Sequence, residues 1–192
     1  FKKEEPVKLN PVQAQQLKEQ PPTPQGRRDQ LMMCLLLDHG LRVGEVTGLS
    51  ATDLDLAEGV LRFYRPKVNK EQVHRLTRET LHAALACRSN GELPAQGLLL
   101  RRSKKNEELG APGMSERAVT ARVRLLGERL GVMGLSAHDC RHYWATSAAR
   151  HGTDPFVLQE AGGWSSLAMP RRYVEENEIA NDGVKLDKDR DQ

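Results

Sequence analysis

One stretch of the chain, residues 135–173, gathers side chains that could bind and transfer a phosphate group. Ser136 is a good N-cap, and the periodic apolar residues after it predict a helix over residues 136–150. His138 and Arg141 stand three residues apart near the start of that helix, so they share one face. The free N–H groups at a helix start and the planar fork of a guanidinium group both suit phosphate oxygens.

Residues of matching chemistry lie elsewhere in the chain. Arg42 lies in the apolar segment LRVGEV, where Glu45 is its obvious ion-pair partner. Lys67 lies at the tip of a predicted hairpin, from which a lysine can reach a phosphate backbone. Trp164 follows two glycines, and Tyr173 follows two arginines. Taken singly, these residues have ordinary explanations: a structural ion pair, a solvated lysine, a core indole and a surface tyrosine.

Taken together, the candidates suit phosphoryl transfer without a metal ion. Arginines stabilise the charge that develops on non-bridging phosphate oxygens, and a tyrosine phenol can act as a covalent nucleophile. Because a phenol has a pKa of about 10, it needs a base or cationic surroundings. This interpretation requires the guanidinium groups of Arg42 and Arg141 to share one pocket. The full set of candidates, in chain order, is Arg42, Lys67, His138, Arg141, Trp164 and Tyr173.

Composition and motifs narrow the classes of function. The 192 residues suit one domain, and no apolar run approaches the roughly 18 residues of a membrane span. The net charge of +3 is compatible with nucleic acid, and three widely spaced cysteines indicate free thiols in a reducing compartment. The chain has no P-loop and no Gly-x-Ser-x-Gly elbow, and HDCRH lacks the glutamate of the zinc motif HExxH. We therefore expect no cofactor and no metal.

Hydrophobic periodicity predicts a mainly helical α+β domain with a small three-stranded antiparallel sheet at one edge. The basic run RRSKKN, residues 101–106, is expected to be a loop, and residues 98–100 a short apolar piece. Pro170 predicts a kinked or short helix before Tyr173. The predicted helices are a short one at Arg42 and others over residues 12–19, 27–39, 78–88, 116–130, 136–150 and 154–161, and the predicted strands cover 53–56, 59–65 and 72–76.

In the order and spacing of these residues the chain resembles the catalytic domain of the tyrosine recombinase, or phage integrase, family. The resemblance runs from about residue 8 to residue 173, close to a whole catalytic domain. Each motif alone is weak, but their shared order is a specific signal. The matching segments are GLRVGE with Arg42, KVNKEQV with Lys67, HDCRH with His138 and Arg141, GGW with Trp164, and RRY with Tyr173.

The resemblance implies a site-specific DNA recombinase, an integrase, that cleaves and rejoins double-stranded DNA through a 3′-phosphotyrosyl intermediate. Tyr173 would attack the scissile phosphate while Arg42 and Arg141 hold it. The energy of the broken bond would be kept in the phosphotyrosine, so rejoining would need neither a metal nor a nucleotide.

The remaining roles are also implied by the resemblance. Lys67 would protonate the leaving 5′-oxygen, with Lys70 as the alternative after a hairpin slip of three residues. His138 would assist proton transfer at the tyrosine. Trp164 would fill the position at which the family has His or Trp, and would contribute an indole donor and packing.

The resemblance further implies a homo-oligomer, a tetramer, on DNA, and a cytoplasmic, nucleoid-associated protein of bacterial or phage origin. It divides the chain into three parts. Residues 1–7 would be the remnant of a linker to an amino-terminal DNA-clamping domain, 8–174 the catalytic domain, and 175–192 a tail that docks on a neighbouring protomer. The alternatives are a type IB topoisomerase-like enzyme, a non-catalytic DNA-binding module of the same fold, and a zinc domain that uses His138, Cys140 and His142.

Overall fold

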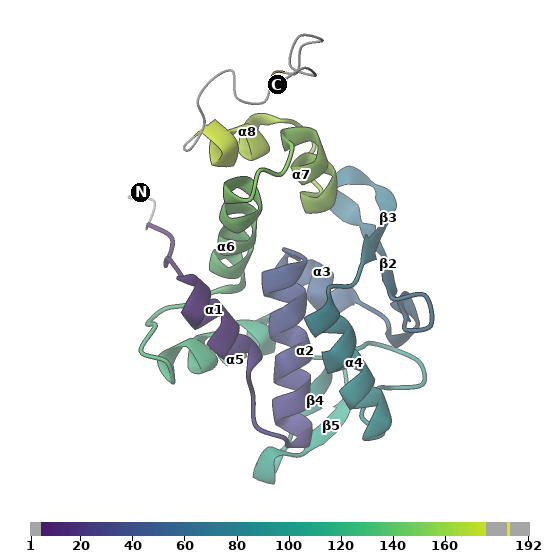
Figure 1. Cartoon of the computed structure of the whole chain (residues 1–192). Coiled ribbons are helices and arrows are strands. Elements are labelled where there is room, and N and C mark those ends of the chain that lie inside the picture. The colour runs from purple at the N-terminus through teal and green to yellow at the C-terminus, as the bar shows by residue number, and fades with distance from the viewer. Residues whose placement is uncertain (1–4, 176–183, 185–192) are drawn as a thin grey trace, which may run out of the picture.

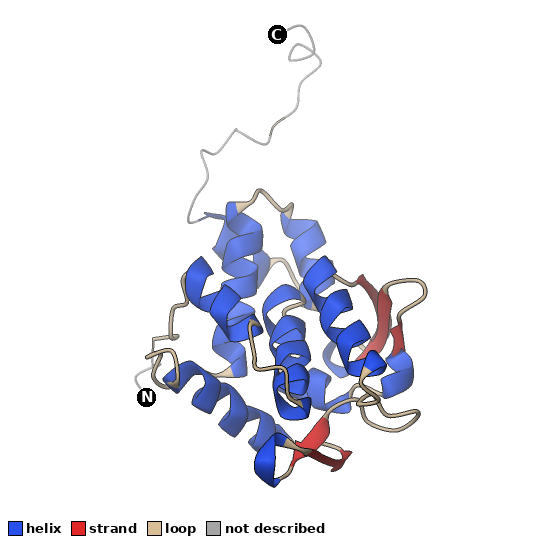
Figure 2. Ribbon diagram, turned by 60° about the horizontal axis from the view of Figure 1, so that its bottom comes forward, coloured by secondary structure: helices blue, strands red, loops and turns tan. Residues whose placement is uncertain are grey.

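The computed structural model describes residues 5–175 and residue 184. Within them lie eight α-helices and two small antiparallel sheets, with the three-stranded sheet at one edge of the helical body (Figures 1 and 2). This confirms the predicted mainly helical fold. The helices are α1 (Pro11–Lys18), α2 (Pro24–Asp38), α3 (Val43–Gly48), α4 (Arg78–Ser89), α5 (Glu116–Glu128), α6 (Ala137–Arg150), α7 (Pro155–Gly162) and α8 (Ala168–Glu175). The strands are β1 (Leu54–Asp55), β2 (Val60–Arg65), β3 (Lys70–Arg75), β4 (Arg101–Ser103) and β5 (Leu109–Pro112).

Helix α2 forms the centre of the core. Every residue from 31 to 37 is buried, because α1, α4 and α6 pack around the helix on different sides. A helix that is apolar on all its faces needs such enclosure. Helix α2 begins three residues before the predicted start, since the hydroxyl of Thr23 accepts a hydrogen bond from Gly26 N and Pro24 fits the first turn.

The predicted hairpin is confirmed and it presents Lys67 at its tip. Strands β2 and β3 pair antiparallel from Val60 opposite Arg75 to Arg65 opposite Lys70. A short 3₁₀ turn over Pro66–Val68 joins them. The reversal is completed by Asn69, whose φ of 47° lies in the left-handed region that asparagine tolerates better than most residues.

The prediction of a basic loop at residues 101–106 was wrong for residues 101–103, because Arg101–Ser103 is strand β4 and pairs with β5. The reason lies in a distant partner. Arg28, buried in α2, donates from Nη1 to the carbonyl oxygen of Arg101 (2.9 Å) and to the hydroxyl of Ser103 (2.8 Å). The apolar piece just before the strand is buried at Leu99 and Leu100.

A second, smaller hydrophobic cluster lies where α6, α7 and α8 meet. Its buried members are Ala145, Leu158 and Tyr173, and two tryptophans pack against it. Helix α8 is short, as Pro170 predicts, and the proline lies in its first turn, where a missing N–H breaks no helical bond. This cluster places Tyr173 against α6.

Two further sequence predictions concern the C-terminal tail and the absence of a membrane span. The predicted docking tail lies outside the described residues, except for residues 175 and 184. No helix within the described residues is long and apolar enough to cross a membrane.

Candidate active site

A cavity of about 460 Å³ lies where α3, the β2–β3 hairpin tip, the start of α6 and the segment after α7 meet. We call it the arginine cavity. Five of the six predicted site residues line it, although they come from distant parts of the sequence. They are Arg42, Lys67, His138, Arg141 and Trp164. The sixth, Tyr173, is not among the lining residues.

The two predicted arginines share one acceptor. Arg141 is buried and donates to the carbonyl oxygens of Gly40 (2.6 Å) and Gly162 (2.7 Å). Arg42 donates to the same Gly162 oxygen (3.2 Å) and to that of Gly163 (3.3 Å). The guanidinium groups at positions 42 and 141 therefore converge on one pocket, as the sequence interpretation requires.

The C-terminal end of α7 supplies the carbonyl oxygens that hold these arginines. The last carbonyls of a helix have no partners within it and carry the negative end of the helix dipole, so they favour cationic donors. A third arginine, Arg65, donates to the preceding carbonyl oxygen, that of Ala161, at 2.8 Å. Gly163 ends the helix at a φ of 64°, and a Cβ atom there would overlap the guanidinium group of Arg65. Only glycine both adopts this positive φ readily and leaves room for the side chain of Arg65.

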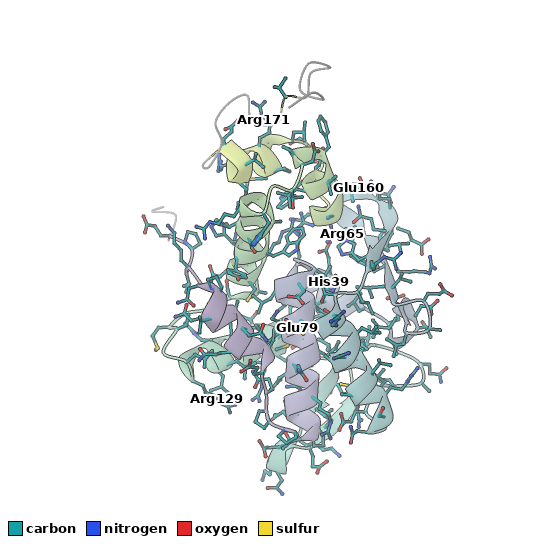
Figure 3. The ribbon with its side chains drawn as sticks, viewed as in Figure 1. His39, Arg65, Glu79, Arg129, Glu160 and Arg171 are labelled. Carbon is teal, nitrogen blue, oxygen red and sulfur yellow. The ribbon has the colours of Figure 1, made fainter. Side chains whose placement is uncertain are left out.

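Arg65 is a site residue that sequence reasoning missed. It is fully buried, and its Nε lies 3.1 Å from Oε2 of Glu45. Arg65 also lies near Glu160 on α7 (Figure 3). The predicted Arg42–Glu45 pair is also present, at 3.3 Å, so one carboxylate serves two arginines. The period-2 alternation of β2 could have revealed Arg65 as a buried residue, because it shares the buried face with Leu61 and Phe63.

Three guanidinium groups around one carboxylate leave an excess of positive charge. Burial, and then repulsion by Arg42 and Arg65, lowers the pKa of Arg141 to about 9. Burial also lowers the pKa of Arg65 to about 10, against the attraction of Glu45. Both groups stay cationic at neutral pH, and an anion in the cavity would relieve their repulsion. The electrostatics therefore suit a phosphate.

Trp164 supports the arginines from one side. The guanidinium carbon of Arg141 lies 4.2 Å from the centroid of its ring, a cation–π arrangement. The indole also stacks on Trp144, with 6.3 Å between ring centroids and 23° between planes. Trp164 thus packs against the guanidinium group of Arg141 and also lines the cavity.

The two lysines left open by the sequence differ in their surroundings. Lys67 is exposed and lines the arginine cavity. The ammonium group of Lys70 is paired instead with the carboxylate of Glu160, at 2.8 and 2.9 Å. His138 is exposed at the start of α6 and also lines the cavity.

Tyr173 contacts a histidine that was not among the candidates. Its phenolic oxygen lies 3.0 Å from Nδ1 of His142, one turn after His138 on α6. The ring of Tyr173 lies 6.1 Å from that of Trp164. Tyr173, the candidate nucleophile, therefore lies next to Trp164 of the cavity, but its phenol contacts His142, which does not line the cavity.

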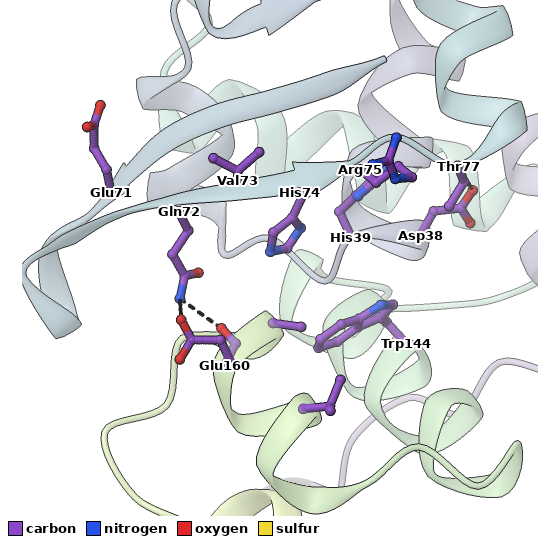
Figure 4. Close-up of a pocket in the computed structure, with 12 residues that line it drawn as sticks. Asp38, His39, Glu71, Gln72, Val73, His74, Arg75, Thr77, Trp144 and Glu160 are labelled. Carbon is purple, nitrogen blue, oxygen red and sulfur yellow. Dashed lines mark hydrogen bonds between the residues drawn. The ribbon is translucent and has the colours of Figure 1, made fainter. Parts of the chain in front are cut away.

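A second cavity, of about 560 Å³, lies between β3 and α7 (Figure 4). Gln72 donates across it to Glu160, and burial lowers the pKa of both His39 and His74 to about 4. Its lining holds three carboxylates, one arginine and two neutral imidazoles, a balance of charge that does not suit a phosphate. As for the zinc alternative, no three His, Cys, Asp or Glu side chains in the described part of the chain are placed to hold a metal ion, and Cys140 is buried in the core.

Comparison with known proteins agrees with the sequence motifs. The profile of the phage integrase family matches residues 8–179. The tyrosine recombinase XerC of Azotobacter vinelandii is 34% identical over 153 residues, which cover 77% of this chain and 48% of that protein. XerC of Pseudomonas aeruginosa PAO1 is 32% identical over 151 residues, covering 77% and 47%. The chain thus spans about half the length of the curated relatives it matches.

Solved structures share the fold. The XerA recombinase superposes with a TM-score of 0.73 at 24% identity, covering 90% of this chain and 61% of that one. XerH recombinase bound to palindromic difH in a post-cleavage complex gives 0.71 at 20% identity, covering 90% and 50%. Because the family profile matches most of the sequence, the chain belongs to the phage integrase family.

Proposed function

We propose that this chain is the catalytic part of a site-specific tyrosine recombinase, which cleaves and rejoins double-stranded DNA through a 3′-phosphotyrosyl intermediate. The observation that carries the proposal is the convergence of Arg42 and Arg141 on the carbonyl oxygen of Gly162, beside a cavity that Lys67 also lines. Membership of the phage integrase family and the XerC relatives support it.

In this proposal the arginine cavity binds the scissile phosphodiester. Arg42 and Arg141 donate to its non-bridging oxygens and stabilise the charge that develops there during transfer. Because backbone carbonyls and Trp164 already fix the two guanidinium groups, little reorganisation is needed when the phosphate arrives. Preorganised donors of this kind are the main source of catalysis in a site without a metal.

The covalent step exchanges one phosphodiester for another. The oxygen of Tyr173 forms a bond to phosphorus, the bond to the 5′-oxygen breaks, and the proton of the phenol passes to a base. Lys67 gives a proton to the leaving 5′-oxygen, and His138, which also lines the cavity, assists proton transfer at the phenol. The reverse reaction rejoins the strand, since the phosphotyrosyl bond keeps the energy of the broken one.

The proposed partner is double-stranded DNA, on which the protein would act as a homo-oligomer, a tetramer. Solved relatives support the DNA part of this proposal. XerH was solved bound to its difH substrate, and the Tn1549 transposon integrase with circular intermediate DNA. We also propose the division into a linker (1–7), a catalytic domain (8–174) and a docking tail (175–192), and a nucleoid-associated location.

A covalent-trapping assay tests the proposal. The protein is incubated with supercoiled plasmid and with nicked duplex libraries that let the cleaved strand diffuse away, and is then denatured. We expect a protein–DNA adduct whose linked residue maps to Tyr173. Tyr173→Phe should abolish the adduct and leave DNA binding largely intact. Loss of DNA binding in this variant would instead show that the tyrosine is structural.

The topoisomerase alternative has a separate readout. A type IB-like enzyme relaxes supercoils without pairing two sites, whereas a recombinase exchanges strands between two copies of one site. Relaxation of any plasmid, with no preference for sequence, would favour the alternative. Adducts confined to one site and its repeat would favour recombination.

A further inference from the structure

The phenol of Tyr173 is held outside the arginine cavity. Its oxygen lies 3.0 Å from Nδ1 of His142, and the two rings meet at 5.2 Å and 57°. The side chain is buried, and neither residue lines the cavity that Arg42 and Arg141 form. A phenol that attacks a phosphate held by these arginines must lie at that cavity.

His142 lies along a different hollow. A groove of about 360 Å³ runs between α6 and the entering segment of the chain, residues 5–11, and His142 lines it. The segment is tied to α6 where Val7 N donates to Asp139 Oδ1 at 2.9 Å. His138, which does line the arginine cavity, precedes His142 by one helical turn, roughly 5 Å along α6. The hydrogen-bond partner of the phenol therefore lies one turn beyond the histidine that lines the arginine cavity.

We propose that His142 is a positioning residue that holds Tyr173 in a resting position, from which the phenol is released when DNA occupies the arginine cavity. The inference rests on the proposed role of Tyr173 as the nucleophile. It assigns His142 a function distinct from that of His138, although both lie on one face of α6. The hydrogen bond to His142 must break before the phenol reaches the phosphate, so it opposes the first cleavage.

The hydrogen bond between His142 and Tyr173 is weak enough to break when DNA binds. A single hydrogen bond between neutral groups contributes little net free energy, because each partner can bond to water instead. Contacts with a phosphate backbone can overcome it. Without the bond, the surroundings of the phenol in DNA-free protein should change, and the first covalent step should be faster by about threefold to tenfold.

The test compares three single variants of the full chain. His142→Phe keeps a planar ring and removes the hydrogen-bonding atoms, and His142→Gln keeps an amide that can bond to the phenol. His151→Phe is the matched control, since His151 is an exposed histidine at the end of the same helix. His142→Leu replaces His142→Phe if the latter does not fold, as judged by circular dichroism.

The first readout needs no DNA. The chain has three tyrosines, so 3-fluorotyrosine labelling gives three ¹⁹F signals, which Tyr→Phe variants assign to Tyr64, Tyr143 and Tyr173. We expect His142→Phe to shift the Tyr173 signal, and His142→Gln and His151→Phe to leave it near its wild-type position. An unmoved Tyr173 signal in His142→Phe would overturn the proposal.

The second readout is the single-turnover rate of adduct formation. We expect His142→Phe to be about threefold to tenfold faster than wild type, and His142→Gln to be close to wild type. A slower rate in His142→Phe would overturn the proposal and make His142 a proton acceptor in the reaction. If the wild-type protein forms no adduct at Tyr173 at all, the proposed function fails, while the ¹⁹F signal still reports whether His142 holds the phenol.

Discussion

Arg42 and Arg141 donate to one atom, the carbonyl oxygen of Gly162, at 3.2 and 2.7 Å. A carbonyl oxygen fixes the position of a guanidinium group without neutralising its charge. The hydrogen-bond acceptors of Arg141 in the described part of the chain are two such oxygens, and no carboxylate there forms an ion pair with it. The cavity is therefore organised before a ligand arrives and still carries the charge that attracts an anion.

The geometry of Arg141 predicts that a positive charge at this position is not enough for rapid adduct formation. Arg141→Lys keeps a cation but loses the fork that reaches Gly40 and Gly162 together. We expect adduct formation to slow by about 10²–10³, the loss typical of one donor to a developing negative charge. Arg42→Ala and Arg141→Ala should each raise the barrier by about 3–4 kcal/mol. Single-turnover trapping measures these rates.

The control for Arg141 lies on the same helix. Arg150 is exposed at the end of α6, so Arg150→Ala should leave the rate of adduct formation near that of wild type. Gel-shift titration checks that DNA binding changes little in all of these variants. A wild-type rate in Arg141→Lys would mean that the fork geometry does not matter.

A second prediction concerns Glu45, the carboxylate between Arg42 and Arg65. The side chains of Glu45 and Arg65 are 6% and 0% exposed, so Glu45→Ala leaves a buried cation without its partner. We expect the free energy of unfolding to fall by about 3–5 kcal/mol. Urea denaturation measures this change. Adding Arg65→Met should recover part of the loss, because it removes the unpaired charge.

An exposed ion pair nearby serves as the comparison. Lys70 and Glu160 are 44% and 68% exposed, so Lys70→Ala should change the free energy of unfolding by only about 0–1 kcal/mol. Equal losses in Glu45→Ala and Lys70→Ala would show that burial of the Glu45 pair does not set its contribution.

The helices could be predicted because their signals are local. Ser136 and Asn10 are caps whose side chains accept from the backbone three residues on, and the structure contains both bonds. The β4–β5 hairpin could not be predicted, since its stabilising donor, Arg28, lies far away in the sequence. Short polar strands carry little periodic signal of their own, so tertiary contacts decide them.

The site residues likewise divide into those with a local sequence signal and those that depend on tertiary contacts. Residues with a motif around them, such as Arg42 and Arg141, could be named from the sequence, and five of the six line one cavity. Arg65 and His142 are not among the six. The alternation of β2 could place Arg65 on a buried face, but what each of the two residues contacts depends on which segment packs against it. Arg65 matters through the C-terminal end of α7, and His142 through Tyr173 on α8.

A third prediction concerns acid stability. Burial lowers the pKa of His39 from 6.5 to about 4, and its Nε2 lies 3.0 Å from the hydroxyl of Thr80. The unfolded chain therefore takes up a proton at this residue below pH 6.5, while the folded protein does so only near pH 4. The contribution of His39 to the free energy of unfolding therefore falls as the pH drops through this window, by about 2 kcal/mol between pH 7 and pH 5.

Urea denaturation at the two pH values checks this contribution. The variant His39→Gln cannot titrate, so its free energy of unfolding should depend less on pH, whatever its absolute stability. The exposed His151 is the control, since His151→Gln should keep the wild-type pH dependence. An equally steep dependence in His39→Gln would mean that other groups account for the acid sensitivity.

The final prediction separates the two lysines of the hairpin. Lys67 lines the arginine cavity, while Lys70 is paired with Glu160, so Lys67 is the candidate that can protonate the leaving 5′-oxygen. Lys67→Ala should slow adduct formation on normal DNA by about 10²–10⁴, the range for loss of a general acid. With sulfur in place of the bridging 5′-oxygen, that defect should disappear, because a thiolate leaves without a proton. Lys70→Ala should be near wild type on both substrates. A sulfur substrate that rescues Lys70→Ala instead would assign the acid to Lys70 and require the hairpin to shift its register.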